Sequence, residues 1–296
     1  MSDGSTLAKP QAADKGENQH LDAVIVGAGF SGMYQLHLLR DRLGLRARVL
    51  ERGDGVGGTW YWNRYPGARC DSESHSYSYY FSDALLQEWE WSERYPQQPE
   101  IVRYLNFAAD KLDLKRDIQL NTTVTAARYD EAANRWLVET ESGETFSAKY
   151  LITAVGCLSS ANVPDIPGRD RFQGKWYHTG QWPHEGVDLT GKQVGQIGTG
   201  STGIQAVPVI AAEAQHLTVF QRTANYSIPA QNGPLSAEFK TWAKKNTDEI
   251  RRTMHASTNG HPFLMAERNV FDVSAEERRA IYEKAWQVGG FGLLIP

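Results

Sequence analysis

The first part of the chain alternates between apolar and polar stretches in an order that predicts a strand, a helix and a second strand. An apolar stretch over residues 22–26 leads directly into the glycine-rich segment 27–32. Beyond this segment, apolar residues recur at helical spacing, which predicts a helix with one buried face. The residues of that face are Met33, Leu36, Leu39 and Leu43. A short apolar strand over 48–50 then ends at Glu51, so this stretch has the order of a βαβ unit.

The same order returns in the second half of the chain. Strands are predicted over 194–197 and 217–220. Between them lie a second glycine-rich segment, 198–203, and a predicted helix over 204–212. Two such units in one chain predict an α/β protein with two Rossmann-like dinucleotide-binding domains.

The segments around the two units follow other patterns. Residues 53–80 are typical of loops, being rich in Gly, Trp, Tyr and Ser. Alternation over 123–149 predicts paired strands, and the apolar run over 150–155 predicts a buried strand. After Pro229 the pattern becomes helical, and residues 274–277 have the spacing of a capping box.

Composition narrows the classes of function. The net charge is −4 and no basic stripe is visible, which argues against nucleic acid as a partner. The apolar runs are too short to span a bilayer, so no membrane partner is expected. Residues 1–20 lack the apolar core of a secretory signal and predict a disordered tail. Cys70 and Cys157 form no Cys-x-x-Cys pair, which fits a cytoplasmic protein without a disulfide framework; no metal site is expected.

The first glycine-rich segment has the spacing Gly-x-Gly-x-x-Gly of a loop that binds a dinucleotide pyrophosphate. Its glycines would make a tight turn, allow backbone amides to approach the phosphates, and allow close packing of helix on strand. Glu51 follows at the distance expected for a carboxylate that accepts the hydroxyls of an adenosine ribose. This pattern predicts a site for FAD; the alternative is a purely structural turn. The expected contacts are Gly27, Gly29, Phe30, Ser31, Gly32 and Glu51.

The second glycine-rich segment repeats this spacing, but the strand after it is followed by Arg222. A guanidinium there is a partner for a ribose 2′-phosphate, which a carboxylate would repel. The sequence therefore favours NADP(H) over NAD(H) at this site, unless Arg222 points to solvent. The expected contacts are Gly198, Thr199, Gly200, Ser201, Thr202, Gly203, Arg222 and Thr223.

Two nucleotide sites with different ribose chemistry imply a relay in which NADPH reduces a bound flavin. A disulfide reductase would pass the electrons to a redox-active cysteine pair. The two cysteines of this chain do not form one. Oxygen or a small oxidant is therefore the expected electron acceptor.

The segment between the two units resembles a known fingerprint. Baeyer–Villiger monooxygenases carry the pattern Phe-x-Gly-x-x-x-His-x-x-x-Trp-Pro, which residues 172–183 match at every specified position. The matching residues are Phe172, Gly174, His178, Trp182 and Pro183. A second family segment is matched by 57–60, by 65–67 and by Asp71. The chain from about Asp22 onward is similar to this family.

The resemblance implies an NADPH- and O₂-dependent flavin monooxygenase that converts a ketone to an ester or lactone through a C4a-peroxyflavin. It implies flavin contacts at Gly58, Thr59, Trp60 and Tyr77. It also implies that Asp71, with Arg69 beside it, supports catalysis near the flavin and nicotinamide. His178 would link domain movements, although a loop histidine with only local hydrogen bonds is the alternative. Likewise, Trp60 could belong to an ordinary core and Asp71 could be an ordinary loop carboxylate.

The resemblance also suggests a division of the chain. We expect a tail over 1–20, the N-terminal part of the FAD-binding domain over 21–158, a linker over 159–190, the first part of the NADP-binding domain over 191–229, and a helical insert over 230–296. In the family, the main catalytic arginine and the end of the FAD domain lie beyond such an insert. We therefore expect a truncated family member that by itself binds flavin poorly and does not oxygenate ketones. Alternatives are an N- or S-oxidising flavin monooxygenase and a non-catalytic nucleotide-binding fragment.

Overall fold

The structure is a computed structural model that describes residues 19–265 and 267–294. It divides into two compact units. Unit 1 joins the residues up to Val56 to Asp113–Val155, and unit 2 joins Gly57–Leu112 to the residues from Gly156 onward. These ranges differ from the linear division expected from the sequence, and the cofactor domains themselves stay a prediction. The tail expected over 1–20 lies outside the described residues except for its last two positions, which belong to the first strand.

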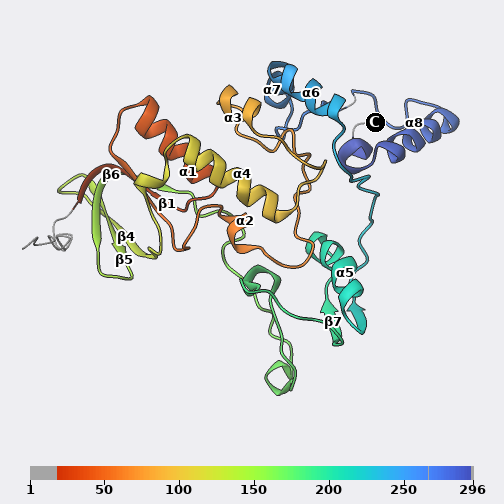
Figure 1. Cartoon of the computed structure of the whole chain (residues 1–296), viewed down its shortest axis with the longest axis horizontal. Helices are drawn as coiled ribbons and strands as arrows, with labels where there is room; N and C mark the ends of the chain where they lie inside the picture. Colours follow the sequence, from red (N-terminus) through yellow and green to blue (C-terminus); the bar gives the residue numbers. More distant parts are fainter. Residues whose placement is uncertain (1–18, 266, 295–296) are drawn as a thin grey trace, which may run out of the picture. The chain divides into compact units, whose positions relative to one another are not determined.

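Unit 1 is built on a six-stranded mixed sheet with strand order β3-β2-β1-β6-β5-β4 (Figure 1). The central strand β1 pairs in parallel with β2 on one side and β6 on the other. β4, β5 and β6 form an antiparallel meander. The strands are β1 Gln19–Val26, β2 Ala47–Leu50, β3 Ile118–Gln119, β4 Val124–Asp130, β5 Arg135–Thr140 and β6 Thr145–Thr153. The strands predicted in this region are thereby confirmed, with β1 starting three residues earlier than expected.

The helix after β1 has the predicted buried face for two turns and then changes type. α1 spans Phe30–His37, and a π-helical turn follows over Leu38–Arg42. Within this turn the Leu43 amide donates to the Leu38 carbonyl, five residues back. The wider turn shifts the helical phase, so Leu43 is 60% exposed rather than part of the buried face. The prediction was wrong at this residue because it assumed an uninterrupted α-helical period.

The apolar run near the end of β6 is also less buried than predicted. The core on this side of the sheet consists of Val24, Leu50, Val138, Phe146 and Ala148. β6 contributes to it through its N-terminal half, whereas Tyr150 is 57% exposed. The strand ends at Thr153, two residues short of the predicted range. Leu151 still packs against this core as a partly buried side chain, so the apolar run is half-buried rather than buried throughout.

Unit 2 contains most of the helices and a two-stranded parallel sheet (Figure 1). Its helices are α2 Thr59–Trp62, α3 Asp83–Glu88, α4 Gln98–Lys111, α5 Ser201–Glu213, α6 Ala237–Lys245, α7 Thr247–Ala256 and α8 Ala275–Val288. Its strands are β7 Gln193–Ile197 and β8 His216–Phe220. Short 3₁₀ turns lie in unit 1 at Lys115–Asp117 and in unit 2 at Arg169–Arg171, Thr179–Gln181 and Gly290–Leu294.

The second βαβ order is confirmed as β7, α5 and β8. α5 packs on the strands through a small cluster made by Ala206, Ile210 and Leu189. Further along, the serine of the predicted capping box caps α8, since the Ser274 hydroxyl accepts from the Glu277 amide at 3.1 Å. The Glu277 carboxylate instead accepts from Arg268 at 3.1 Å.

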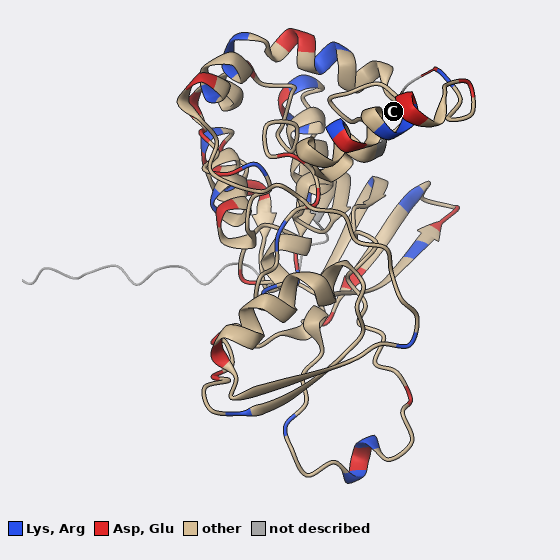
Figure 2. Ribbon diagram, turned by 90° about the vertical axis from the view of Figure 1, so that its right-hand side faces the viewer, with Lys and Arg blue, Asp and Glu red and all other residues tan. Residues whose placement is uncertain are grey.

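Charged residues of both signs are interspersed along the ribbon in Figure 2. Within the described residues, no helix is long and apolar enough to cross a membrane.

Candidate functional site

The two glycine loops, residues 27–32 and 198–203, have nearly the same backbone geometry although they belong to different units. Gly27 and Gly198 both have φ of +103°, which favours glycine. Each donates its amide to the last carbonyl of the following strand, Gly27 to Leu50 and Gly198 to Phe220, both at 2.9 Å. The equal spacing in the sequence therefore encodes equal loop conformations.

The third glycine of each loop allows the helix to start directly against the loop. A Cβ atom at Gly32 would lie 1.8 Å from the carbonyl oxygen of Gly27. The equivalent Cβ at Gly203 would lie 2.5 Å from the carbonyl oxygen of Gly198. No side chain fits at either position, as predicted from the spacing.

The second glycine of the second loop is different, because the protein itself does not require a glycine there. Gly200 has φ of −73°, which any residue adopts, and a Cβ atom there would meet no protein atom within 4 Å. Gly29 has a similar backbone conformation, with φ of −81°. The protein alone would tolerate a side chain at this position, yet the residue is glycine. This fits the close approach of a ligand such as a pyrophosphate.

No side chain caps the start of either helix that follows the two loops. α1 and α5 have no side-chain cap and no acidic residue in the first turn. By contrast, serines cap α3, α6 and α8, and each of these helices carries an acidic residue in its first turn. Among the described α-helices of eight or more residues, only α1 and α5 lack both features. Uncapped amides at a positive helix end fit an anionic ligand.

The carboxylate of Glu51 performs a task that sequence reasoning missed. One oxygen accepts from the Ala28 amide at 2.7 Å and the other accepts from the Gly53 amide at 2.9 Å. The residue is only 4% exposed, so it fastens the first glycine loop to the end of β2. A carboxylate has about four acceptor positions, so capacity for ribose hydroxyls remains. That second role stays a prediction.

In the second unit the structural counterpart of Glu51 is Gln221 rather than Arg222. The first loop glycine bonds to Leu50 in one unit and to Phe220 in the other, and Glu51 and Gln221 each come next. Gln221 donates to the Thr199 hydroxyl at 2.9 Å. Counting residues from the glycine loop therefore matched Arg222 to Glu51, one position too far along the chain. The exchange of a carboxylate for an amide removes a negative charge, and Arg222 follows as an exposed cation.

The segment predicted to hold the flavin ring forms the start of α2 and the loop after it. Gly58 precedes α2, and Thr59 and Trp60 are its first residues. The Trp60 indole donates to the Tyr77 hydroxyl at 2.9 Å, and the two rings meet edge to face. Burial raises the pKa of Tyr77 to about 12, so this hydroxyl stays protonated at neutral pH. The structure brings these two residues together, while their contact with a flavin stays a prediction.

Asp71 and Arg69 are held by a residue of α5 that the sequence did not single out. The Gln205 side chain donates to Asp71 Oδ1 at 2.9 Å and to the Arg69 carbonyl at 3.2 Å. The Arg69 guanidinium lies 3.9 Å from the Glu93 carboxylate. Asp71 itself is exposed. The loop carrying Asp71 is therefore tied directly to the helix of the second glycine loop.

The fingerprint segment has a local explanation for some of its residues. His178 Nδ1 accepts from the Gly180 amide at 3.1 Å and so caps the turn at Thr179–Gln181. Trp182 is buried, whereas Phe172 is exposed and its ring leaves no room for a side chain at Gly174. After Pro183, the ring of His184 packs against those of Tyr61 and Trp62. His178 thus has the local hydrogen bond expected of an ordinary loop histidine, which was the alternative interpretation. Its link to domain movements stays a prediction.

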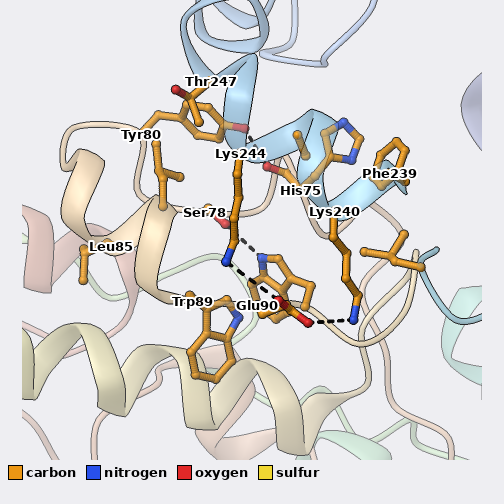
Figure 3. Close-up of a pocket in the computed structure, with 14 residues that line it drawn as sticks. His75, Ser78, Tyr80, Leu85, Trp89, Glu90, Phe239, Lys240, Lys244 and Thr247 are labelled. Atoms are coloured by element: carbon orange, nitrogen blue, oxygen red, sulfur yellow. Dashed lines mark hydrogen bonds and ion pairs between the residues drawn. The ribbon is translucent and has the colours of Figure 1, made fainter. Parts of the chain in front are cut away.

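A cavity of about 50 Å³ in unit 2 is lined by other residues than the candidate site residues above (Figure 3). Lys240 and Lys244 of α6 reach the Glu90 carboxylate at its rim, with N···O distances of 2.9 and 3.8 Å. The Lys240 hydrogen bond lowers the pKa of Glu90. His75 lines the same cavity, and burial lowers its pKa.

Neither cysteine has the setting of a redox thiol. Cys70 is buried, and this burial raises its pKa to about 11. Cys157 is exposed, and both thiols are free. A protonated thiol is a poor nucleophile, so Cys70 is not suited to disulfide exchange at neutral pH.

Comparison with known proteins gives consistent relatives. Residues 24–288 match the family described as pyridine nucleotide-disulphide oxidoreductase. A Baeyer-Villiger monooxygenase of Pseudooceanicola batsensis is 48% identical over 269 residues, covering 91% of this chain and 49% of that protein. A phenazine N-monooxygenase of Lysobacter antibioticus is 44% identical over 280 residues, covering 94% of this chain and 52% of that protein.

A solved structure agrees with these matches. Cyclohexanone monooxygenase from Rhodococcus, bound to NADP⁺, is similar with a TM-score of 0.91 and 45% identity, covering 94% of this chain and 52% of that one. The chain spans about half the length of the curated relatives it matches. The α/β fold predicted from the sequence is therefore shared with this solved oxygenase over half of that enzyme's length.

Proposed function

Because the chain belongs to the pyridine nucleotide-disulphide oxidoreductase family and is related to Baeyer–Villiger monooxygenases, we propose that the protein carrying it oxygenates a ketone with NADPH and O₂. Overall, ketone, O₂, NADPH and a proton would give an ester or lactone, NADP⁺ and water. The observation that carries this proposal is the pair of matched glycine loops, each followed by an uncapped helix. FAD when bound would supply the redox chemistry, taking electrons from NADPH and delivering them to O₂.

The first loop would hold the pyrophosphate of FAD. Gly29 would allow the approach of the phosphates, and the first amides of α1 would donate to them. Glu51 would accept the ribose hydroxyls with the lone pairs that Ala28 and Gly53 leave unused. Trp60 and Tyr77 would cover the ring system, their mutual hydrogen bond fixing both side chains. Side chains that exclude water from the ring would protect the redox chemistry that FAD supplies when bound.

The second loop would hold the pyrophosphate of NADPH in the same manner. Gly200 leaves space at the N-terminus of α5, and Ser201 and Thr202 begin that helix. Arg222 would pair with the 2′-phosphate, a role that a guanidinium performs with two parallel hydrogen bonds. No ion pair of Arg222 with a described residue competes for this role. The Gln221 side chain would accept hydrogen bonds from the ribose hydroxyls and, being uncharged, would not repel the 2′-phosphate.

Asp71 and Arg69 would support the chemistry near the nicotinamide of the NADPH held at the second loop. Asp71 carries an exposed carboxylate at a fixed position, and Arg69 a half-buried cation two residues before it. Together they would orient charged groups of the nicotinamide and of the oxygenated substrate.

The test is product formation by the purified whole protein that carries this chain. With NADPH, FAD, O₂ and cyclohexanone, we expect consumption of NADPH together with a lactone detectable by gas chromatography and mass spectrometry. Uncoupled NADPH oxidation that yields only hydrogen peroxide with every ketone tried would contradict the proposal.

A second candidate is N-oxygenation of an aromatic amine or heterocycle. It is favoured by the 44% identity to the phenazine N-monooxygenase. The same assay with phenazine in place of the ketone separates the two. An N-oxide without lactone would select this candidate.

A further inference from the structure

Gln205 lies in the second turn of α5 and uses its whole side-chain amide to hold the loop that carries Asp71. Its oxygen accepts from the Tyr65 hydroxyl at 2.8 Å and from the Arg69 amide at 3.2 Å. Its nitrogen donates to the Arg69 carbonyl at 3.2 Å and to Asp71 Oδ1 at 2.9 Å. A primary amide has two donor hydrogens and two acceptor positions, so Gln205 is fully satisfied.

These four bonds also fix the orientation of the amide. The Arg69 N–H must face an acceptor, and the Asp71 carboxylate must face a donor. If the amide were flipped, its NH₂ group would face the Arg69 N–H, so that two donors would meet. Its oxygen would face the Arg69 carbonyl and the Asp71 carboxylate, so that acceptors would meet. Gln205 therefore cannot be exchanged for an acid or an apolar residue without losing part of the network.

The backbone reinforces this arrangement. A Cβ atom at Gly67 would lie 2.2 Å from the Gln205 carbonyl oxygen and 3.1 Å from Val209, so the loop packs directly on α5. Burial raises the pKa of Tyr65, and the nearby Thr202 side chain of the second glycine loop lowers it to a smaller extent. Gln205 belongs to the helix that starts at the second glycine loop, and its bonds to Tyr65 and Asp71 therefore connect that loop to the carboxylate.

The geometry points to Gln205 as a positioning residue that fixes the Asp71 carboxylate relative to the second glycine loop. NADPH held at that loop and the carboxylate beside it are then parts of one rigid assembly. The consequence for catalysis rests on the proposed function. The link between Gln205 and Asp71 does not, and it is testable without any cofactor.

The cofactor-free test uses Gln205→Glu. Its new carboxyl faces Asp71 Oδ1 at hydrogen-bond distance, so ionisation of both groups is unfavourable and one pKa rises above its unfolded value. A raised pKa gives stability that is present below the unfolded pKa and is lost as the pH rises through the folded pKa. We therefore expect the stability deficit of Gln205→Glu relative to the parent protein to be small near pH 4 and to grow towards pH 7.

Other groups near Asp71 do not imitate this effect. Burial raises the pKa values of Tyr65, Cys70 and Tyr95, so these groups stay neutral over this range. The carboxylate of Glu93 lies 3.9 Å from the Arg69 guanidinium. In an Asp71→Asn background the pH-dependent part of the deficit should vanish. A deficit that is equal at both pH values, or that persists in this background, would overturn the inference.

The cofactor-loaded test uses Gln205→Ala and measures reduction of bound flavin by NADPH under anaerobic conditions. Displacement of a positioned group costs on the order of a hundredfold in rate when the shift is about 1 Å. We expect at least a tenfold slower reduction per bound flavin, with the apparent NADPH dissociation constant changed less than threefold. Gln205→Glu should recover part of the rate at low pH, where a proton replaces the lost donor.

A matched control is Gln215→Ala, which removes an exposed glutamine just after α5. It should leave the unfolding midpoint and the reduction rate unchanged. A Gln205→Ala protein with the parent rate per bound flavin would show that the residue only stabilises the fold, which overturns the positioning role. If NADPH fails to reduce flavin even in the parent protein, the proposed function fails, while the pH test still decides the link to Asp71.

Discussion

The two glycine loops share a backbone and differ in what surrounds them. In unit 1, β1 has a parallel partner on each side, and Glu51 is buried against the loop. In unit 2, β7 pairs only with β8 among the described strands, and Ile197 at its end is 72% exposed. Even so, the first glycine has the same φ and the same hydrogen bond in both. The loop conformation is therefore a local property of the glycine spacing and does not depend on a complete sheet.

The difference lies in the residues after the second strand of each unit. The Glu51 carboxylate accepts hydrogen bonds from two backbone amides and so helps to hold the fold of unit 1. Gln221 and Arg222 are exposed, and the Gln221 side chain donates a hydrogen bond to the Thr199 hydroxyl. The loop proposed to hold a pyrophosphate is thus common to both units, and under the proposed function a few residues outside it would set the ribose preference.

The largest effect should come from Gly32→Ala in the first loop. Its Cβ would lie 1.8 Å from the Gly27 carbonyl oxygen, so the helix must move away from the loop. We expect a loss of about 3 kcal/mol or more in the free energy of unfolding, measured by urea denaturation. Because Gly203 is the counterpart in the second loop, Gly203→Ala should show the same kind of effect. Normal stability in both variants would contradict the shared geometry.

Gly200→Ser should separate binding from folding. The new side chain meets no protein atom and suits a helix N-cap, so stability should stay within about 0.5 kcal/mol of the parent or rise. Its hydroxyl would occupy the amides meant for the pyrophosphate, which should weaken NADP⁺ binding about a hundredfold, or roughly 2.7 kcal/mol. Calorimetric titration measures this. Unchanged affinity would mean that no phosphate lies at this loop.

Glu51→Gln should be costly where Gln221→Ala is not. The glutamine can offer one oxygen, so either the Ala28 or the Gly53 amide loses its buried acceptor. We expect a loss of about 2 kcal/mol in unfolding free energy for Glu51→Gln. Gln221→Ala removes only an exposed hydrogen bond and should cost below about 1 kcal/mol. Equal losses of unfolding free energy in the two variants would show that Glu51 and Gln221 contribute equally to the fold, which contradicts the comparison.

Arg222→Ala should have the smallest and most selective effect. Loss of an exposed charged partner for the 2′-phosphate should weaken NADP⁺ binding about tenfold, or roughly 1.4 kcal/mol. NAD⁺, which lacks this phosphate, should bind as before. Arg279→Ala is a suitable control, since Arg279 is an exposed arginine of α8 paired with Glu283. Equal losses for NADP⁺ and NAD⁺ would show that Arg222 does not read the phosphate.

The sequence predicted the repeated βαβ order well, because glycine spacing and strand hydrophobicity are local signals. It failed at Leu43, where a π-helical turn shifts the phase, and at Tyr150, which is exposed although the run around it is apolar. Both errors depend on features that no periodicity contains: a change in helix type and the limit of a core formed by distant strands.

The candidate site was predicted less completely than the fold. The glycines were recognised because each has a distinct geometric task. Gln205 and Gln221 were missed because a glutamine two positions past the loop, or just after a strand, has no sequence signature of its own. Only the packing of the 65–71 loop on α5 shows what Gln205 holds. Arg222 was matched to Glu51 by counting residues, whereas the backbone hydrogen bonds match Gln221 to Glu51.

The most direct test of the central claim is an experimental structure of the protein with FAD and NADP⁺ bound. The pyrophosphate of FAD should accept hydrogen bonds from the amides that start α1, and that of NADP⁺ from the amides that start α5, with the 2′-phosphate at Arg222. Pyrophosphates bound away from both glycine loops would contradict the account.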